Sequence, residues 1–364
     1  MTGPILLMAR ALGQGGSERQ LAEMAVALSK RGWQVHVACF EEGGMRARDL
    51  AQAQIPVLSL GIRSFRSLSF LAALRRLAQY RRKHGIRFLH AFDYPSNFVA
   101  ALAGHWCGFS RIITSQRSFR ELRSASWRRV LRWTDRRADA IVVNCEALRG
   151  HMIVEEGAPA AKVHVCHNGL DAARFPMRTA GNGQVMGVVC ALRPEKGLPV
   201  LLRAFAEVAR TRPQAHLLVV GSGPEHESLR RLATEFGIDR QCEWQPATAD
   251  VAPWLQRMDI FVLPSESEAF SNSLLEAMAS RCAVVASAVG GNIEMLDQGH
   301  FGMLFPRGDA PALAQQLARL LDHPAERERL AGMAAARVRE LYSIDRAADT
   351  FERLYRAVEE RLVR

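Results

Sequence analysis

The feature that most constrains the fold is an alternation of short apolar runs with longer helical stretches along the whole chain. The runs are rich in Val, Ile and Leu and are apolar almost throughout, which is typical of strands buried on both faces. Strands that alternate with helices predict a parallel sheet covered by helices. In the first half the predicted strands are residues 5–8, 35–40, 56–60, 88–92, 111–115, 140–144 and 163–166.

The pattern restarts after a polar segment at residues 173–184, which we interpret as a linker. Further strands are predicted at residues 185–192, 216–220, 260–263 and 283–286, and two helices at 325–341 and 346–361 close the chain. A length of 364 residues also favours two domains. We therefore expect an α/β chain of two Rossmann-like, doubly wound domains at 1–172 and 185–341, with residues 342–364 packing back on the first. Ligands of such sheets bind at the carboxyl ends of the strands.

Charge and cysteine content narrow the class of protein. Residues 1–180 carry 27 Lys or Arg and 13 Asp or Glu, while residues 181–364 carry 21 and 24. A basic first half suggests an anionic partner. No apolar run reaches the length of a membrane span, and the short N-terminal run lacks a basic lead, so we expect a cytoplasmic protein. The seven cysteines form no C-x-x-C pair, which favours reduced thiols over a zinc site or disulfides.

The most informative segment is residues 264–291, PSESEAFSNSLLEAMASRCAVVASAVGG. A strand ends before it, a polar loop follows, and Ser271 and Asn272 are good residues to begin a helix. The N-terminal amides of a helix favour an anion such as a diphosphate. Glu268 and Glu276 flank this helix start, and carboxylates accept hydrogen bonds from sugar or ribose hydroxyls.

This segment resembles the Glu-x7-Glu signature of the retaining GT-B glycosyltransferases of family 4. The resemblance implies that Glu268 contacts the donor sugar and that Glu276 holds the nucleotide ribose. It also implies that backbone amides over a short run hold sugar and phosphate, namely those of Phe270, Ser271, Asn272, Ser273 and Leu274.

Two further segments of the second half resemble motifs of the same family. The first follows the strand at 185–192 and consists of Arg193 and the pair Lys196-Gly197. In the family, the Arg and Lys of this turn would stabilise the leaving diphosphate. Gly221 and Gly223 match a G-x-G-P turn that lines the nucleotide pocket. At Gln245 the family usually has Gly, which leaves the choice of base open.

The first half carries the other motifs. Gly15 and Gly16 lie in a loop that resembles the family's G-G-x-E-R loop and would face the donor diphosphate. On the acceptor side, His90 or Asp93 is a candidate to orient an acceptor hydroxyl. Arg117 stands where many family members have His, and it suggests contact with an anionic acceptor or donor.

These motifs predict a retaining glycosyltransferase that moves a sugar from a nucleotide-sugar, with UDP the commonest carrier in the family, to a glycan or lipid-linked acceptor of cell-surface polysaccharide. No D-x-D pair occurs in the chain, and Arg193 and Lys196 would replace a metal ion, so no metal or other cofactor is expected. Two alternatives remain open: a nucleotide-sugar-binding scaffold without turnover, and a nucleotide-sugar 2-epimerase.

Positive charge concentrates at residues 63–85 and 117–137, where Arg alternates with Phe, Leu and Trp at helical spacing. Such helices suit an anionic membrane surface, which predicts peripheral association with the inner face of the plasma membrane. A solvated, arginine-rich face is the alternative interpretation. No nucleic-acid-binding motif is present, and we expect no nucleic-acid partner.

Overall fold

The computed structural model describes residues 3–41, 43–121, 124–179, 181 and 183–360. The chain forms two compact units, which we call unit 1 (Met1–Gly169 with Ile344–Arg364) and unit 2 (Leu170–Ser343). The chain leaves unit 1 at Gly169, whereas the sequence placed the boundary at residue 172. Leu170 already pairs with Ser343 in a parallel bridge, so backbone contacts of unit 2 begin there.

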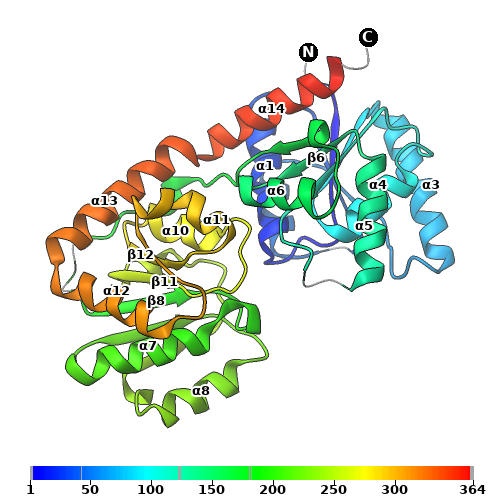
Figure 1. Cartoon of the computed structure of the whole chain (residues 1–364). Coiled ribbons are helices and arrows are strands. Elements are labelled where there is room, and N and C mark those ends of the chain that lie inside the picture. The colour runs from blue at the N-terminus through cyan, green and yellow to red at the C-terminus, as the bar shows by residue number, and fades with distance from the viewer. Residues whose placement is uncertain (1–2, 42, 122–123, 180, 182, 361–364) are drawn as a thin grey trace. The chain divides into compact units, whose positions relative to one another are not determined.

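Unit 1 is built on a parallel sheet with helices packed around it (Figure 1). The strand order is β3-β2-β1-β4-β5-β6-β7. Its strands are short and, except for the two edge strands β3 and β7, buried almost throughout. They are β1 (Ile5–Ala9), β2 (Val35–Cys39), β3 (Val57–Ser59), β4 (Phe88–Ala91), β5 (Arg111–Gln116), β6 (Ala140–Val143) and β7 (Val163–Val165).

Helices cover both faces of this sheet, because its strands are apolar on both sides. Residues of α1 and α14 share one apolar core with β1 and β2, and residues of α3 and α4 share another with the opposite face of those strands. The helices of unit 1 are α1 (Gly16–Lys30), α2 (Met45–Gln52), α3 (Leu68–His84), α4 (Tyr94–Ala103), α5 (Ala125–Arg137), α6 (Glu146–Val154) and α14 (Ile344–Glu360). The last helix of the chain therefore belongs to unit 1, where Phe351 and Tyr355 are buried.

Unit 2 repeats the same topology with a parallel sheet in the order β10-β9-β8-β11-β12-β13. The strands are β8 (Val185–Val189), β9 (His216–Val220), β10 (Cys242–Gln245), β11 (Ile260–Leu263), β12 (Ala283–Ser287) and β13 (Met303–Phe305). The helices are α7 (Leu198–Thr211), α8 (His226–Glu235), α9 (Ala252–Leu255), α10 (Asn272–Ala279), α11 (Gly290–Met295), α12 (Ala310–Asp322) and α13 (Pro324–Leu341).

Both sheets reverse their strand order at the first strand, β1 in unit 1 and β8 in unit 2. At such a switch point the loops on either side diverge and leave room for a ligand at the carboxyl ends of the strands. In unit 2 these loops follow β8 and β11, which pair with each other. They are the two loops that carry the predicted Arg193, Lys196 and Glu268.

Within the described residues, no helix combines the length and the apolar character that crossing a bilayer requires.

Candidate active site

The loops after β8 and β11 are joined by backbone and side-chain contacts. The amide of Glu266 donates to the carbonyl of Glu195 at 2.9 Å. The ammonium of Lys196 forms an ion pair with Oε1 of Glu268, and Ser265 Oγ donates to the same oxygen at 2.9 Å. The structure thus brings two predicted site residues into direct contact, and it adds Ser265, for which the sequence motif suggested no role.

The ion pair fixes the charge of Lys196 and the orientation of Glu268. Burial alone would lower the pKa of Lys196, but the neighbouring Glu268 carboxylate outweighs burial and raises that pKa above its ordinary value. Lys196 is therefore a permanent cation at neutral pH. Glu268 Oε2 accepts no hydrogen bond from any described residue, so this oxygen is left to accept one from a ligand hydroxyl.

Arg193 lies at the start of the same short turn, η3 (Pro194–Lys196), but its side chain is differently placed. The guanidinium is 62% exposed and has a loose contact with Glu195 at 3.9 Å. An exposed guanidinium with one weak ion pair can turn to a phosphate and hold it through two hydrogen bonds.

Gly197 ends this turn in the left-handed region, at φ +66°, and its backbone lies against the other loop. A Cβ at this position would come 2.2 Å from the carbonyl oxygen of Pro264. Only glycine allows the two loops to approach this closely, and their closeness places Lys196 beside Glu268.

We expect Gly197→Ala to weaken UDP binding about tenfold or more, equivalent to about 1.4 kcal/mol, because the β11 loop must move. Gly237→Ala is the matched control, since Gly237 has φ +71° but a Cβ there would meet no atom within 4 Å. Both variants incur the left-handed cost of roughly 1–2 kcal/mol, and only the first disturbs the site. Titration calorimetry and urea unfolding measure the two effects. Equal UDP affinity in both variants would show that the loop contact does not shape the site.

The turn after β9 packs on the same loop and continues the site. Cβ atoms at Gly221 and Gly223 would come 1.9 Å from the Cys190 carbonyl and 2.3 Å from the Leu192 carbonyl. These two predicted glycines are therefore required by close backbone packing. Ser222 Oγ accepts a hydrogen bond from the amide of Ala247, which lies in the loop after β10. This contact connects the turn after β9 to the loop where the sequence predicted the nucleotide base.

Helix α10 begins as the sequence predicted. Ser271 caps it, and its Oγ accepts from the amide of Leu274 at 3.3 Å. The first-turn amides of Asn272 and Ser273 therefore come directly after the loop that follows β11. Glu276 lies one turn further on and is buried, and Phe270 packs on Tyr342 with ring centroids 5.2 Å apart.

In unit 1, Gly15 and Gly16 lie at the start of α1, where Gly15 is the N-cap. The carboxylate of Glu18 covers Gly15, because a Cβ there would come 2.1 Å from Glu18 Oε2. Burial, with the nearby charge of Asp93 adding to it, raises the pKa of Glu18. Glu18 belongs to the predicted glycine-rich loop but was given no role, and its position marks it as a further candidate contact.

Asp93 serves the fold. Its Oδ1 accepts from the amide of Ser96 at 2.8 Å and caps α4, and its Oδ2 accepts from the amide of Arg10 at 2.6 Å. Both carboxylate oxygens are thus bound to backbone. The structure gives the predicted acceptor-orienting Asp93 a helix-capping role instead.

His90 is also different from the prediction. It lies in β4 with no exposed surface, and its ring nitrogens contact Tyr355 Oη and Ser115 Oγ, each at 2.8 Å. Burial lowers the pKa of His90 well below its ordinary value, so the ring is neutral. A ring enclosed in this way does not reach an acceptor hydroxyl, and the structure does not support the predicted catalytic role.

Arg117 follows β5 and keeps its charge without a carboxylate partner among the described residues. Its guanidinium donates to Asn168 Oδ1 at 2.7 Å and lies 4.8 Å from the centre of the Phe92 ring. Burial lowers its pKa to about 10, which still leaves it charged at neutral pH. A half-buried cation with no acid beside it suits an anionic ligand.

The basic stretch 117–137 is less available than its sequence suggested. Arg120 is fully buried and makes two hydrogen bonds to Asp135. Arg128 and Arg132 both pair with the buried carboxylate of Glu156, at 2.7 and 2.9 Å. Three arginines of this stretch are therefore compensated inside unit 1, an arrangement that helical spacing alone cannot reveal.

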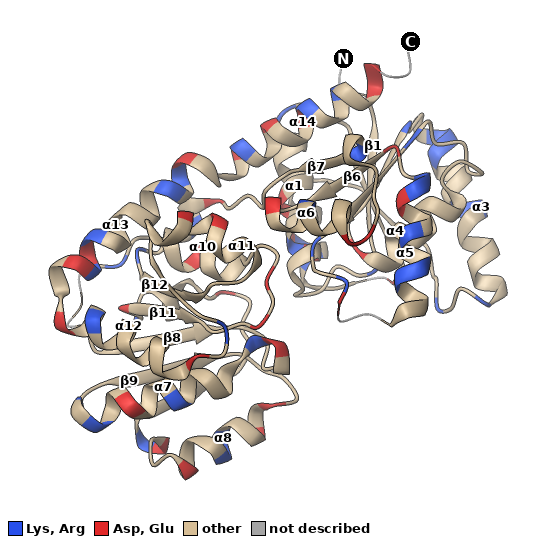
Figure 2. Cartoon of the chain, in the orientation of Figure 1, with Lys and Arg blue, Asp and Glu red and all other residues tan. Residues whose placement is uncertain are grey.

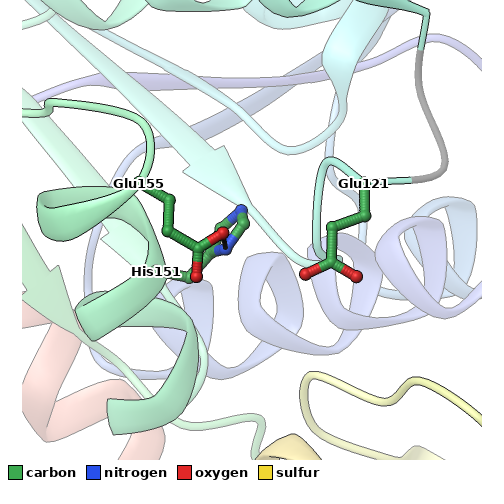
Figure 3. Close-up of side chains that lie close together, drawn as sticks. All are labelled: Glu121, His151 and Glu155. Atoms are coloured by element: carbon green, nitrogen blue, oxygen red, sulfur yellow. Dashed lines mark ion pairs between the residues drawn. The ribbon is translucent and has the colours of Figure 1, made fainter.

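Among the residues that the structure describes, one cluster offers metal-ligand chemistry: the ligand atoms of Glu121, His151 and Glu155 lie within 4.8 Å of one another (Figure 3). Glu155 and His151 are one helical turn apart and pair at 3.0 Å. Both glutamates are exposed, and the cluster borders the network of Arg120, Arg128 and Arg132 around Glu156. The contact of Glu155 with His151 joins two members of the cluster directly, and none of the three residues belongs to the predicted donor site.

The chain has two parallel-sheet units of Rossmann topology, and the second carries cations and carboxylates at its switch point. These features together define a GT-B protein. The family model described as "Glycosyltransferase Family 4" matches residues 14–174, and that described as "Glycosyl transferases group 1" matches residues 183–323. Together they match more than half of the chain, which belongs to the family 4, group 1 glycosyltransferases.

Relatives and solved structures agree with this assignment. A D-inositol 3-phosphate glycosyltransferase of Kineococcus radiotolerans is 34% identical over 254 residues, which are 62% of this chain and 58% of the relative. The lipopolysaccharide core biosynthesis mannosyltransferase LpcC of Rhizobium leguminosarum is 26% identical over 62% of this chain and 67% of its own length. The alignments thus span somewhat over half the length of most of these relatives. Anabaena Alr3699/HepE, solved in complex with UDP, shares the fold with a TM-score of 0.85 at 22% identity, over 98% of this chain and 100% of its own.

Proposed function

We propose that this chain transfers a sugar from a UDP-sugar donor to a glycan or lipid-linked acceptor, with retention of the anomeric configuration and without a metal ion. The observation that carries the proposal is the cationic turn of Arg193 and Lys196, joined to Glu268 at the switch point of unit 2. Anabaena Alr3699/HepE, which shares this fold, was solved with UDP and with UDP-glucose.

The chemistry follows from where charge develops. As the glycosidic bond breaks, the leaving diphosphate gains negative charge, and fixed cations stabilise that change more than they stabilise the bound donor. Lys196 supplies a positioned point charge, and Arg193 a mobile guanidinium. The amides that begin α10 add dipoles of the same sign. In the proposed reaction the departing phosphate takes the acceptor proton on the same face of the sugar, so no enzymic nucleophile is needed.

One nearby side chain with nucleophilic chemistry is unsuited to attack. Burial raises the pKa of Cys190 to about 12, so its thiol stays protonated at neutral pH.

The acceptor is proposed from unit 1 and from the relatives' names. Arg117 supplies a half-buried cation for an anionic group on acceptor or donor. Relatives are named for D-inositol 3-phosphate and for lipopolysaccharide core biosynthesis. We therefore favour an anionic acceptor of cell-surface glycan synthesis, used by a protein at the cytoplasmic face of the membrane. The glycine loop at Gly15 and Gly16 is proposed to face the donor.

Analysis of the reaction products distinguishes sugar transfer from two other possible functions. A nucleotide-sugar-binding scaffold would bind the donor without turnover, and a 2-epimerase would convert the donor without an acceptor. Release of UDP that depends on acceptor supports the transferase. Anomeric analysis of the product by NMR then tests retention.

The first test is thermal unfolding of the full chain with UDP, GDP, ADP, CMP and UDP-sugars in the presence of EDTA. A ligand at 100 times its dissociation constant stabilises a folded unit by about 2.7 kcal/mol, which is a readable shift. We expect UDP to shift the transition and the other nucleotides to have little effect. No shift with any nucleotide would refute the pocket in unit 2.

The ribose assignment is tested by Glu276→Gln, which preserves the volume of this buried side chain. Hydrogen bonds to a charged group contribute about 1.5–3 kcal/mol, so UDP affinity should fall roughly 10- to 100-fold. Calorimetric titration with UDP measures this, and Glu294→Gln on the neighbouring α11 is the control. Unchanged affinity in Glu276→Gln would remove Glu276 from the nucleotide site.

A further inference from the structure

Residues 50–92 contain no Asp or Glu and eight Lys or Arg. Helix α3 lies in this stretch, and Figure 2 shows basic residues and no acidic residue along it. Among the described residues, the stretch forms one ion pair, between Arg87 and Glu359. Six of its basic residues are exposed and have no carboxylate partner among the described residues: Arg63, Arg66, Arg75, Arg76, Arg82 and Lys83.

Large apolar side chains are exposed on the same helix. Leu68 and Leu71, in its first turn, are 83% and 57% exposed, although Phe70 between them is buried in the core. Trp106, in the turn after α4, is 83% exposed. The next residue, Cys107, donates from Sγ to the Leu74 carbonyl at 3.5 Å, which attaches this turn to α3 one helical turn beyond Leu71.

We propose that these residues form a docking surface for a lipid bilayer with anionic headgroups. We call Leu68, Leu71, Trp106 and the six exposed basic residues the α3 surface. The cations alone would suit any polyanion, including a nucleic acid or an acidic glycan. Two exposed leucines and a tryptophan gain free energy on transfer from water to an apolar environment, and a bilayer interface offers such an environment next to phosphate. A bilayer is therefore the partner that satisfies both sets of side chains.

The inference deepens the proposed function, because a membrane-docked transferase meets a lipid-linked acceptor in the plane of the bilayer. Docking itself requires neither donor nor turnover. The test therefore measures binding to vesicles, and failure there leaves the UDP experiments unaffected.

The experiment is flotation of the full chain with vesicles of phosphatidylcholine, with and without phosphatidylglycerol. We expect the protein to float with the anionic vesicles at low salt and to stay at the bottom with phosphatidylcholine alone. High salt should weaken the binding, because the charges are exposed and screened. A protein that stays at the bottom with anionic vesicles at low salt overturns the proposal.

Two variant pairs locate the surface. Each exposed Arg near an anionic bilayer changes partitioning by about fivefold, so Arg75→Gln with Arg76→Gln should weaken it by at least tenfold. The matched control is Arg230→Gln with Arg231→Gln, an adjacent exposed pair on α8. For the apolar part, Leu68→Ser with Trp106→Ser should abolish flotation, and Val154→Ser with Met177→Ser, also exposed, should not.

Two further outcomes would overturn the proposal. Equal losses in the α3 variants and their controls would show non-specific charge attraction and overturn the proposed surface. Retention of the chain by dextran sulfate or RNA, without flotation, would assign the cations to a polyanion and overturn the bilayer as the partner. Thermal unfolding of every variant, with and without UDP, checks that both units remain folded, because the α3 variants lie in unit 1.

Discussion

Replacing Lys196 with alanine should lower kcat by roughly two to three orders of magnitude, the range found when one preorganised group that stabilises developing charge is removed. Lys196 is held by Glu268, and its raised pKa keeps it charged at neutral pH. Its loss also leaves the Glu268 carboxylate without its cation. Because the cation acts mainly on charge that develops during bond cleavage, kcat should fall more than UDP affinity.

The measurement is steady-state release of UDP from the donor that passes the thermal test, with the dissociation constant of UDP measured in parallel. Arg307→Ala is the matched control, since Arg307 is an exposed cation that pairs with Glu266 of the same β11 loop at 3.1 Å. It should change kcat less than twofold, an effect expected for a surface ion pair of about 0–1 kcal/mol. If Lys196→Ala and Arg193→Ala both left turnover unchanged, the diphosphate assignment would be wrong.

The sequence predicted the fold because buried parallel strands are apolar throughout and stand out against amphipathic helices. It also predicted where the pattern restarts, since the polar segment at 173–184 interrupts it. It missed two strands: β10, which is partly exposed throughout, and β13, which has three residues and differs little from a loop. The predicted strand at 56–60 is shorter in the structure, where β3 is a partly exposed edge strand.

The site in unit 2 could be predicted largely from the positions of its motifs. Each motif follows a strand, and the carboxyl ends of parallel strands lie at one edge of the sheet. The pairing of Lys196 with Glu268 could not be predicted, since the two residues are 72 positions apart and meet only through the packing of Gly197 on Pro264. A glycine after a cationic turn was the one local signal of that contact.

Unit 1 shows the limit of the same reasoning. His90 and Asp93 end a strand at the expected edge, but a residue at that edge can point into the core or cap the next helix. Which of these occurs depends on partners distant in sequence, such as Tyr355 and Arg10. The arginines of 117–137 likewise looked exposed because their acid, Glu156, lies beyond them in the chain.

Arg120 is the residue whose loss should destabilise unit 1 most. Its side chain has no exposed surface, it binds both oxygens of Asp135 at 2.8 and 3.0 Å, and it lies 3.6 Å from Glu156. Arg120→Ala leaves Asp135 buried and unpaired, so the free energy of unfolding should fall by about 3–5 kcal/mol. Burial already raises the pKa of Asp135 despite Arg120, which shows how costly its charge is in this environment.

Urea unfolding of the full chain measures this, and the transition that UDP does not move reports on unit 1. Arg149→Ala is the control, because Arg149 pairs with Glu146 at 3.4 Å on the surface, and it should cost at most about 1 kcal/mol. A cost for Arg120→Ala no larger than that would refute the buried network. The double variant Arg120→Met with Asp135→Leu should recover much of the loss, since apolar residues of similar volume replace a buried pair at little cost. Such recovery would show that the pairing of Arg120 with Asp135 serves the packing of unit 1.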